Sequence, residues 1–195
     1  MRTFRSVSHT RTQHFRGQHR FEHWYRDNSV YFITSKVRDG HHAFRADEAK
    51  QLFWDRLLHH ATSHGFVLFV ATLMSNHYHV LGYLRHGKQL GQFVRKFHGS
   101  VAKLTNDLLP QRHLPFWRTR GGHDYFDGCI RDEQQCRRAY RYTLTQCRRH
   151  GICADWRGYG HTRVWVNLER AVARSLELRA FMDGVPYPRY ERRKY

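Results

Sequence analysis

The stretch from Thr72 to Leu81, TLMSNHYHVL, joins two apolar runs, one over residues 66–73 and one over residues 80–84. We expect strands at 66–73 and 77–84 that pair as a hairpin. Side chains two residues apart in a strand point to the same face, so His77 and His79 would stand side by side. Two such imidazoles can bind a divalent metal. The alternative is a chance pair, because the chain contains 17 histidines.

The segments around this hairpin predict an α+β domain. A β-branched and aromatic run predicts a strand at 30–37, and apolar residues at helical spacing predict helices at 46–64 and 89–108. A further strand is expected within 124–130, and a third helix at 132–150. This order is the split βαβ pattern of a ferredoxin-like sheet with helices packed on one face. His77 and His79 would then lie on the face that receives substrate.

We divide the chain into three parts. Residues 1–27 form a basic N-terminal arm, 28–165 the folded domain, and 166–195 a C-terminal helix (about 167–182) followed by a basic tail. No apolar run approaches the roughly 18 residues that span a bilayer, so we expect no membrane association and a cytoplasmic protein. The four cysteines form no CxxC pair, and we expect them to be free thiols.

The charge balance predicts a nucleic-acid partner. Lysine and arginine number 34 against 16 acidic residues, which gives a formal charge of +18, and aromatic residues are interleaved with the arginines. Arginine binds phosphate oxygens, and aromatic rings stack on unpaired bases. The candidate phosphate-binding residues are Arg95, Lys96, Lys103, Arg118, Arg138 and Arg141. The three on the 89–108 helix are either a wall for DNA or a solvated face, and Phe116, Trp117 and Tyr125 either stack on bases or belong to the core.

The predicted third helix contains a candidate nucleophile. Tyr142 and Gln146 are four residues apart and would share one helical face, whereas Tyr140 would point about 200° away from Tyr142. Gln146 could complete a three-ligand metal site with His77 and His79, leaving positions open for a phosphate oxygen. The Tyr142 phenol would then be placed to attack that phosphate. No carboxylate stands out as a general base.

These motifs resemble those of the HUH single-tyrosine transposases, and most of all the REP-associated tyrosine transposases. The resemblance spans about residues 28–165 and is carried by MSNHYHV at 74–80, Phe116-Trp117 and Arg141-Tyr142. It implies that His77, His79 and Gln146 bind Mg²⁺ or Mn²⁺. It also implies that Tyr142 cleaves single-stranded or hairpin DNA through a 5′-phosphotyrosine, releasing a 3′-hydroxyl, as in DNA transposition.

The sequence differs from these relatives at two places, and two functions other than DNA cleavage are also considered. Ser75 stands where the relatives have proline, and the sequence QCRRHG at 146–151 replaces an Asn-Pro-Val-Arg-Ala-Gly-like stretch. The alternative to an enzyme is a domesticated, non-catalytic binder of DNA hairpins, and a third class is an RNA-binding module. The resemblance implies either a monomer or a homodimer.

Overall fold

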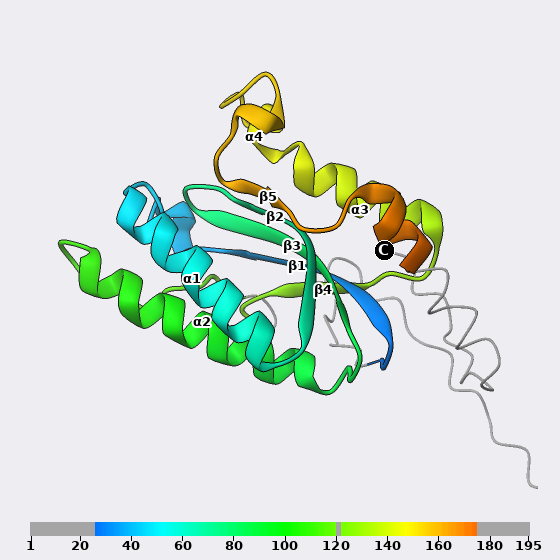
Figure 1. The fold of residues 1–195 in the computed structure, drawn as a ribbon. Helices are drawn as coiled ribbons and strands as arrows, with labels where there is room; N and C mark the ends of the chain where they lie inside the picture. The colour runs from blue at the N-terminus through cyan, green and yellow to red at the C-terminus, as the bar shows by residue number, and fades with distance from the viewer. Residues whose placement is uncertain (1–25, 120–121, 175–195) are drawn as a thin grey trace, which may run out of the picture.

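The computed structural model describes residues 26–119 and 122–174. Its centre is a sheet with the order β4-β1-β3-β2-β5, in which every neighbouring pair is antiparallel (Figure 1). The strands are β1 (Ser29–Lys36), β2 (Phe66–Leu73), β3 (His77–Leu84), β4 (Phe126–Cys129) and β5 (Thr162–Val164). The predicted hairpin is confirmed, and so is the ferredoxin-like order of the first four strands. The short edge strand β5 was not predicted.

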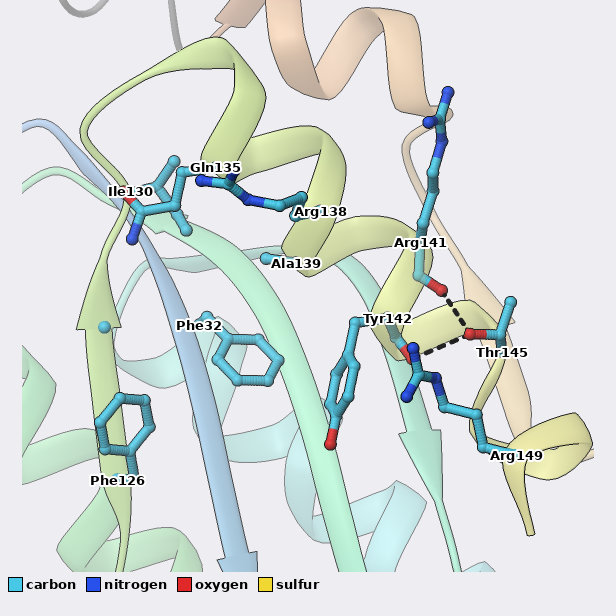
Figure 2. A pocket seen from close by; sticks show the side chains of 11 residues that line it. Phe32, Phe126, Ile130, Gln135, Arg138, Ala139, Arg141, Tyr142, Thr145 and Arg149 are labelled. Atoms are coloured by element: carbon cyan, nitrogen blue, oxygen red, sulfur yellow. Dashed lines mark hydrogen bonds between the residues drawn. The ribbon is translucent and has the colours of Figure 1, made fainter. Parts of the chain in front are cut away.

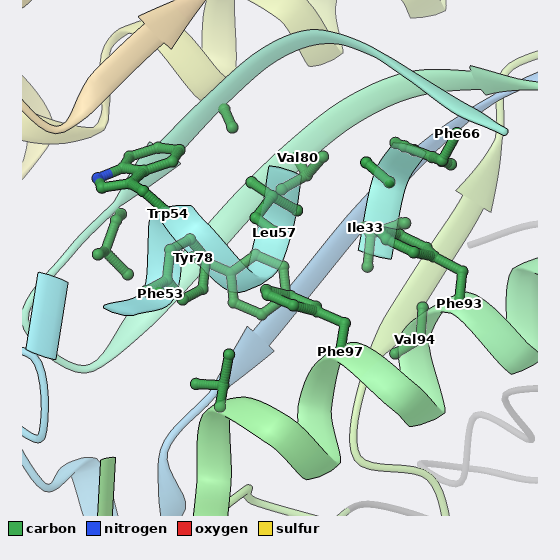
Figure 3. Close-up of a cluster of buried hydrophobic side chains, with 14 of the residues drawn as sticks. Ile33, Phe53, Trp54, Leu57, Phe66, Tyr78, Val80, Phe93, Val94 and Phe97 are labelled. Atoms are coloured by element: carbon green, nitrogen blue, oxygen red, sulfur yellow. The ribbon is translucent and has the colours of Figure 1, made fainter. Parts of the chain in front are cut away.

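One face of the sheet is covered by α1 (Asp47–Ser63) and α2 (Gln89–Leu108), as Figure 1 shows. Gly65 follows α1 with a φ of +66°, the left-handed conformation in which helices often end. The core between these helices and the sheet includes Tyr78, whose ring meets Phe53 and Phe97 at 5.3 and 5.6 Å (Figure 3). Because β3 alternates, burying Tyr78 on this face turns the histidines on either side of it to the opposite face.

The opposite face of the sheet carries α3 (Glu133–Leu144) (Figure 1). A β-bulge between Leu68 and Val70 lets Phe69 and Val70 both join the apolar cluster beneath α3. The buried Thr72 hydroxyl donates to the Thr143 carbonyl at 2.7 Å and thereby ties α3 to β2. The position of α3 is therefore fixed next to the strand that neighbours the histidines.

The prediction of one helix over 132–150 is wrong at its centre. The chain forms α3, then the short α4 (Gln146–Arg149), with Thr145 between them at φ −92° and ψ 11°. The Gln146 side-chain amide donates to the Tyr142 carbonyl at 2.9 Å, and the Thr145 hydroxyl donates to the Arg141 carbonyl at 2.9 Å. Side chains that take up helical carbonyls in this way compete with the regular backbone pattern and favour a break.

Phe116 and Trp117 belong to the core, which decides between the two roles left open for them, base stacking and core packing. Both are buried against α1 and α2, and Trp117 stacks on the buried His98 ring at 4.3 Å. The Trp117 indole donates to the His98 carbonyl at 3.1 Å. Tyr125 is partly buried against the same cluster. A long-range bridge between Trp117 and Val37, just after β1, holds this segment in place, and no local sequence pattern shows it.

The cysteine prediction is wrong for one pair. Cys147 and Cys153 form a disulfide, whereas Cys129 and Cys136 remain thiols among the described residues. Gly151, at φ +67°, turns the chain after α4 and brings the two Cα atoms to 5.5 Å, within disulfide range. The lack of a CxxC pair does not exclude this disulfide, because the turn at Gly151 brings together two cysteines six residues apart.

Several expectations fall partly or wholly outside the described residues. The N-terminal arm is described only from residue 26, and the basic tail not at all. A helix runs from 168 to 174, where the description ends, so the remainder of the predicted 167–182 helix lies beyond it. Within the described ranges, no helix is long and apolar enough to cross a membrane.

Candidate active site

Two buried histidines lie on the central strand of the sheet. His77 and His79 are each 4% exposed, and their ring centroids are 5.2 Å apart with the rings nearly perpendicular. On β1, Lys36 and Thr34 pair with them, and Thr72 of β2 also pairs with His79. Hydrogen-bonded neighbours on both sides hold β3, so the two imidazoles are positioned by a rigid element.

The ring nitrogens of these histidines differ in their hydrogen bonding, and three of the four could accept a cation. His77 Nδ1 lies 2.7 Å from Oδ1 of Asn76, an acceptor, so Nδ1 carries the proton and Nε2 keeps its lone pair. Both ring nitrogens of His79 are buried and have no hydrogen-bond partner among the described residues. A buried polar atom without a partner is costly, and a bound cation is one way to satisfy it.

Burial keeps both imidazoles neutral. It lowers the pKa of His77 to about 4, with a further contribution from the neighbouring His150 and Lys36. Burial lowers the pKa of His79 to about 3, and the neighbouring His77, Lys36 and His150 act in the same direction. The Gln146 amide opposes both shifts without reversing them. Neutral imidazole is the form that binds metal, so the pair is ready for a cation at neutral pH.

Tyr142 of α3 lies directly beside this pair. Its ring is 5.1 Å from the His79 ring and meets it edge-on, and it is 39% exposed. Phe32 of β1 stacks on His79 at 5.7 Å and contacts the edge of Tyr142 at 6.0 Å. Tyr140 points away, as the helical spacing predicts: it is buried, and its hydroxyl donates to the Val166 carbonyl at 2.7 Å. Only one of the two phenols can therefore meet a substrate at the histidines.

Gln146 is the side chain that can complete a metal site. It is 1% exposed and lies close enough to both imidazoles to affect their pKa values. Its amide nitrogen donates to the Tyr142 carbonyl, which leaves the amide oxygen as the atom for a cation. Within the described residues, no group of three His, Cys, Asp or Glu side chains could hold a metal. A cation at this histidine pair would need another kind of third ligand, and an amide oxygen suits Mg²⁺ or Mn²⁺.

One arginine lies over the exposed phenol, and two others line the groove beside it. The guanidinium of Arg149 lies over the Tyr142 ring, 4.8 Å from its centroid. Arg138 and Arg141 line a groove of about 610 Å³ that also includes Tyr142 and Arg149 (Figure 2). Arg149 is not among the phosphate-binding residues predicted from the sequence. Its position seven residues after Tyr142, two helical turns along one face, is the signal that could have identified it.

The other predicted DNA contacts lie elsewhere. Arg95, Lys96 and Lys103 are on α2, across the sheet from the histidines (Figure 1). The backbone N–H of Arg118 donates to the Lys36 carbonyl at 2.8 Å, at the end of β1 that pairs with His77. The structure thus brings Arg138 and Arg141 to the candidate site and places the α2 residues on another surface, where their contact with DNA stays a prediction.

Comparison with known proteins gives the fold a context. The sequence matches no protein-family model and no curated protein. Among solved structures, the chain is similar to a REP-associated tyrosine transposase bound to a REP hairpin, with a TM-score of 0.61 and 14% identity over 73% of this chain and 80% of that one. It is also similar to a candidate transposase from Deinococcus radiodurans R1, with a TM-score of 0.45 and 18% identity over 73% of this chain and all of that one. The first of these likenesses shows that the chain has the fold of a REP-associated tyrosine transposase.

Proposed function

We propose that this protein cleaves single-stranded DNA beside a hairpin and transfers the cut strand through a phosphotyrosine formed on Tyr142. The observation that carries the proposal is the position of the exposed Tyr142 ring, whose centroid lies 5.1 Å from that of the buried His79 ring. Neither ring nitrogen of His79 has a hydrogen-bond partner among the described residues. The shared fold supports it, because the similar transposase is bound to a REP hairpin. The formal charge of +18 supports a DNA substrate.

The proposed step exchanges one phosphoester for another. The Tyr142 oxygen attacks the scissile phosphorus, the bond to the 3′-oxygen breaks, and a 5′-phosphotyrosine and a 3′-hydroxyl result. The phenol loses its proton to solvent, which its exposure allows, and the leaving oxygen takes up a proton. No external energy source is needed, because the phosphoester bond is conserved and a later 3′-hydroxyl can reverse the step.

A divalent cation, Mg²⁺ or Mn²⁺, held by His77, His79 and Gln146 would polarise the phosphoryl oxygen and offset the charge that develops on it. The protein's own contribution is position and charge. Phe32 and the Thr72–Thr143 hydrogen bond fix the phenol relative to the histidines. Arg149, over the Tyr142 ring, places a positive charge where the phenolate and the phosphate would meet.

The test is the formation of a covalent complex. Purified protein is incubated with labelled DNA hairpins that carry single-stranded flanks, with Mn²⁺ or with a chelator, and is resolved on denaturing gels. We expect a slowly migrating adduct that requires the metal and disappears in Tyr142→Phe. The matched control is Tyr140→Phe, which removes a phenol hydroxyl from a different face of the same helix and should retain the adduct. If the protein binds hairpins but forms no adduct under any of these conditions, the proposed enzymatic activity is contradicted and the alternative, a non-catalytic binder of DNA hairpins, is supported.

A further inference from the structure

The Cys147–Cys153 disulfide adjoins the candidate metal site. Cys147 directly follows Gln146, the proposed third metal ligand, and both side chains are buried in the short helix α4. Cys153 lies six residues after Cys147, beyond the end of α4. The bridge therefore joins the residue beside the proposed ligand to the segment that follows the helix.

The loop that this bridge closes carries two more side chains of the site. The Arg149 guanidinium lies over the Tyr142 ring, 4.8 Å from its centroid (Figure 2). The centroid of the His150 ring lies 5.0 Å from that of the His77 ring. Gln146, Arg149 and His150 thus reach the nucleophile and the histidines from one short segment. A movement of this segment would displace all three side chains together.

The conformation of this segment depends on a restraint from outside α4. The backbone N–H of His150 donates to the Gln146 carbonyl at 3.0 Å, and that of Ile152 donates to the Cys147 carbonyl at 2.8 Å. However, α4 has only four residues, and a helix this short is not stable by itself in water. The disulfide supplies a covalent restraint that these local hydrogen bonds alone do not replace.

The position of the bridge suits exchange with a thiol better than support of the whole fold. Cys147 is buried, whereas Cys153 is partly exposed, so a reagent can approach from the Cys153 side. A bridge across six residues restricts the unfolded chain less than a long-range bridge would. In a cytoplasmic protein, which the sequence predicts, a disulfide is usually transient and either catalytic or redox-sensing.

We propose that this disulfide is a redox switch: the oxidised pair holds Gln146 at the metal site, and reduction by a dithiol releases the segment and weakens metal binding. The proposal rests on the proposed function in taking Gln146 as a metal ligand. One thiol of the dithiol attacks Sγ of Cys153, the S–S bond breaks, and Cys147 becomes a thiol. The second thiol of the dithiol then displaces Cys153 as a thiol. Two electrons thus pass to the cysteine pair, and the dithiol is oxidised to a cyclic disulfide.

The test compares the oxidised full-length protein with protein that has been reduced by dithiothreitol and desalted anaerobically. Thiol counting in denaturant should find two thiols in the oxidised form and four in the reduced form. Without metal, the amide hydrogens of residues 147–152 should exchange faster in the reduced form. In calorimetric titrations with Mn²⁺, reduction should weaken the affinity about 10- to 100-fold, the range lost when the outer support of a metal ligand is removed.

Two cysteine variants sharpen this comparison. Cys153→Ser cannot form the bridge, and it should have the low Mn²⁺ affinity of the reduced protein with or without dithiothreitol. Cys129→Ser is the matched control, because it removes a thiol outside the bridge and should keep the full response to reduction. The two forms of the wild type differ by no substitution, so the comparison between them stands even if a variant folds poorly.

Three results would overturn the switch: four thiols in the oxidised sample, equal Mn²⁺ affinity in the two forms, or loss of the whole fold on reduction, as seen by circular dichroism. Covalent capture of DNA by Tyr142 is scored separately on denaturing gels at limiting Mn²⁺. A redox-dependent Mn²⁺ affinity without an adduct in either form contradicts the enzymatic step alone. An adduct with the same yield in both forms contradicts the switch alone.

Discussion

Acid is expected to destabilise this protein through its two buried histidines. Burial lowers the pKa of His79 from 6.5 to about 3, so the native imidazole stays neutral at about pH 5 while the unfolded one binds a proton. The unfolded state then holds more protons than the native state, and the free energy of unfolding falls as the pH drops below 6.5. The same holds for His77, whose pKa is lowered to about 4.

The size of the effect follows from the pKa values. Each pH unit in the window between the native and unfolded pKa changes the free energy of unfolding by about 1.4 kcal/mol per group. Going from about pH 7 to about pH 5 crosses some one and a half units of that window, so His79 alone should account for a loss of about 2 kcal/mol. Above pH 6.5 its contribution to the pH dependence should vanish.

The measurement is urea unfolding at both pH values, without metal, for the wild type and for His79→Gln, which cannot titrate. Other histidines titrate in both proteins, so the difference between the two pH dependences isolates His79. The variant should lose about 2 kcal/mol less than the wild type on acidification. The exposed His86, changed to Gln in the same way, is the control and should keep the wild-type pH dependence. An equal loss in the wild type and His79→Gln would refute the claim that this imidazole is held neutral in the native state.

Three further outcomes test the site and its support. In a thermal-shift assay, Mn²⁺ at a hundredfold excess over its Kd should stabilise the wild type by about 2.7 kcal/mol and so raise its melting temperature. The melting temperature of His79→Gln should not change. Replacing both Arg138 and Arg141 by Ala should weaken binding of single-stranded DNA and reduce the slope of log affinity against log salt by about 1.4. The control is Arg112→Ala, which removes an arginine paired with Asp107 and should change this slope little. Thr72→Val should remove the buried hydrogen bond to the Thr143 carbonyl and lower the free energy of unfolding, measured in urea, by about 1–2 kcal/mol. It should also reduce adduct formation, because this hydrogen bond holds α3, the helix that carries Tyr142.

Local patterns were sufficient for the frame of the fold. The strands at 66–73 and 77–84 and the helix at 89–108 have the predicted bounds, because uninterrupted apolar periodicity extends to their ends. The face of His77 and His79 followed from the same alternation, with Tyr78 buried on the other side of β3. The split βαβ order followed from the sequence of elements.

Contacts between residues far apart in the sequence explain the features that were not predicted or were predicted wrongly. The break after Leu144 depends on where the Gln146 and Thr145 side chains find carbonyl acceptors, and helical periodicity does not report this. Trp117 is buried because its segment bridges Val37, just after β1, and packs into the core with α1 and α2. Its neighbours in sequence do not indicate this contact. Phe32 and Gly128 both line the groove beside Tyr142 and pair across β1 and β4, in a register that only the folded sheet defines.

The central claim is that Tyr142 becomes joined to DNA, and peptide mapping tests it most directly. The adduct formed with a single-stranded hairpin flank and Mn²⁺ is digested with nuclease and trypsin and analysed by mass spectrometry. We predict a nucleotide attached through its 5′-phosphate to the peptide that contains Tyr142, together with a free 3′-hydroxyl on the released strand. A nucleotide attached to another residue, or the same adduct yield from Tyr142→Phe, would contradict the account.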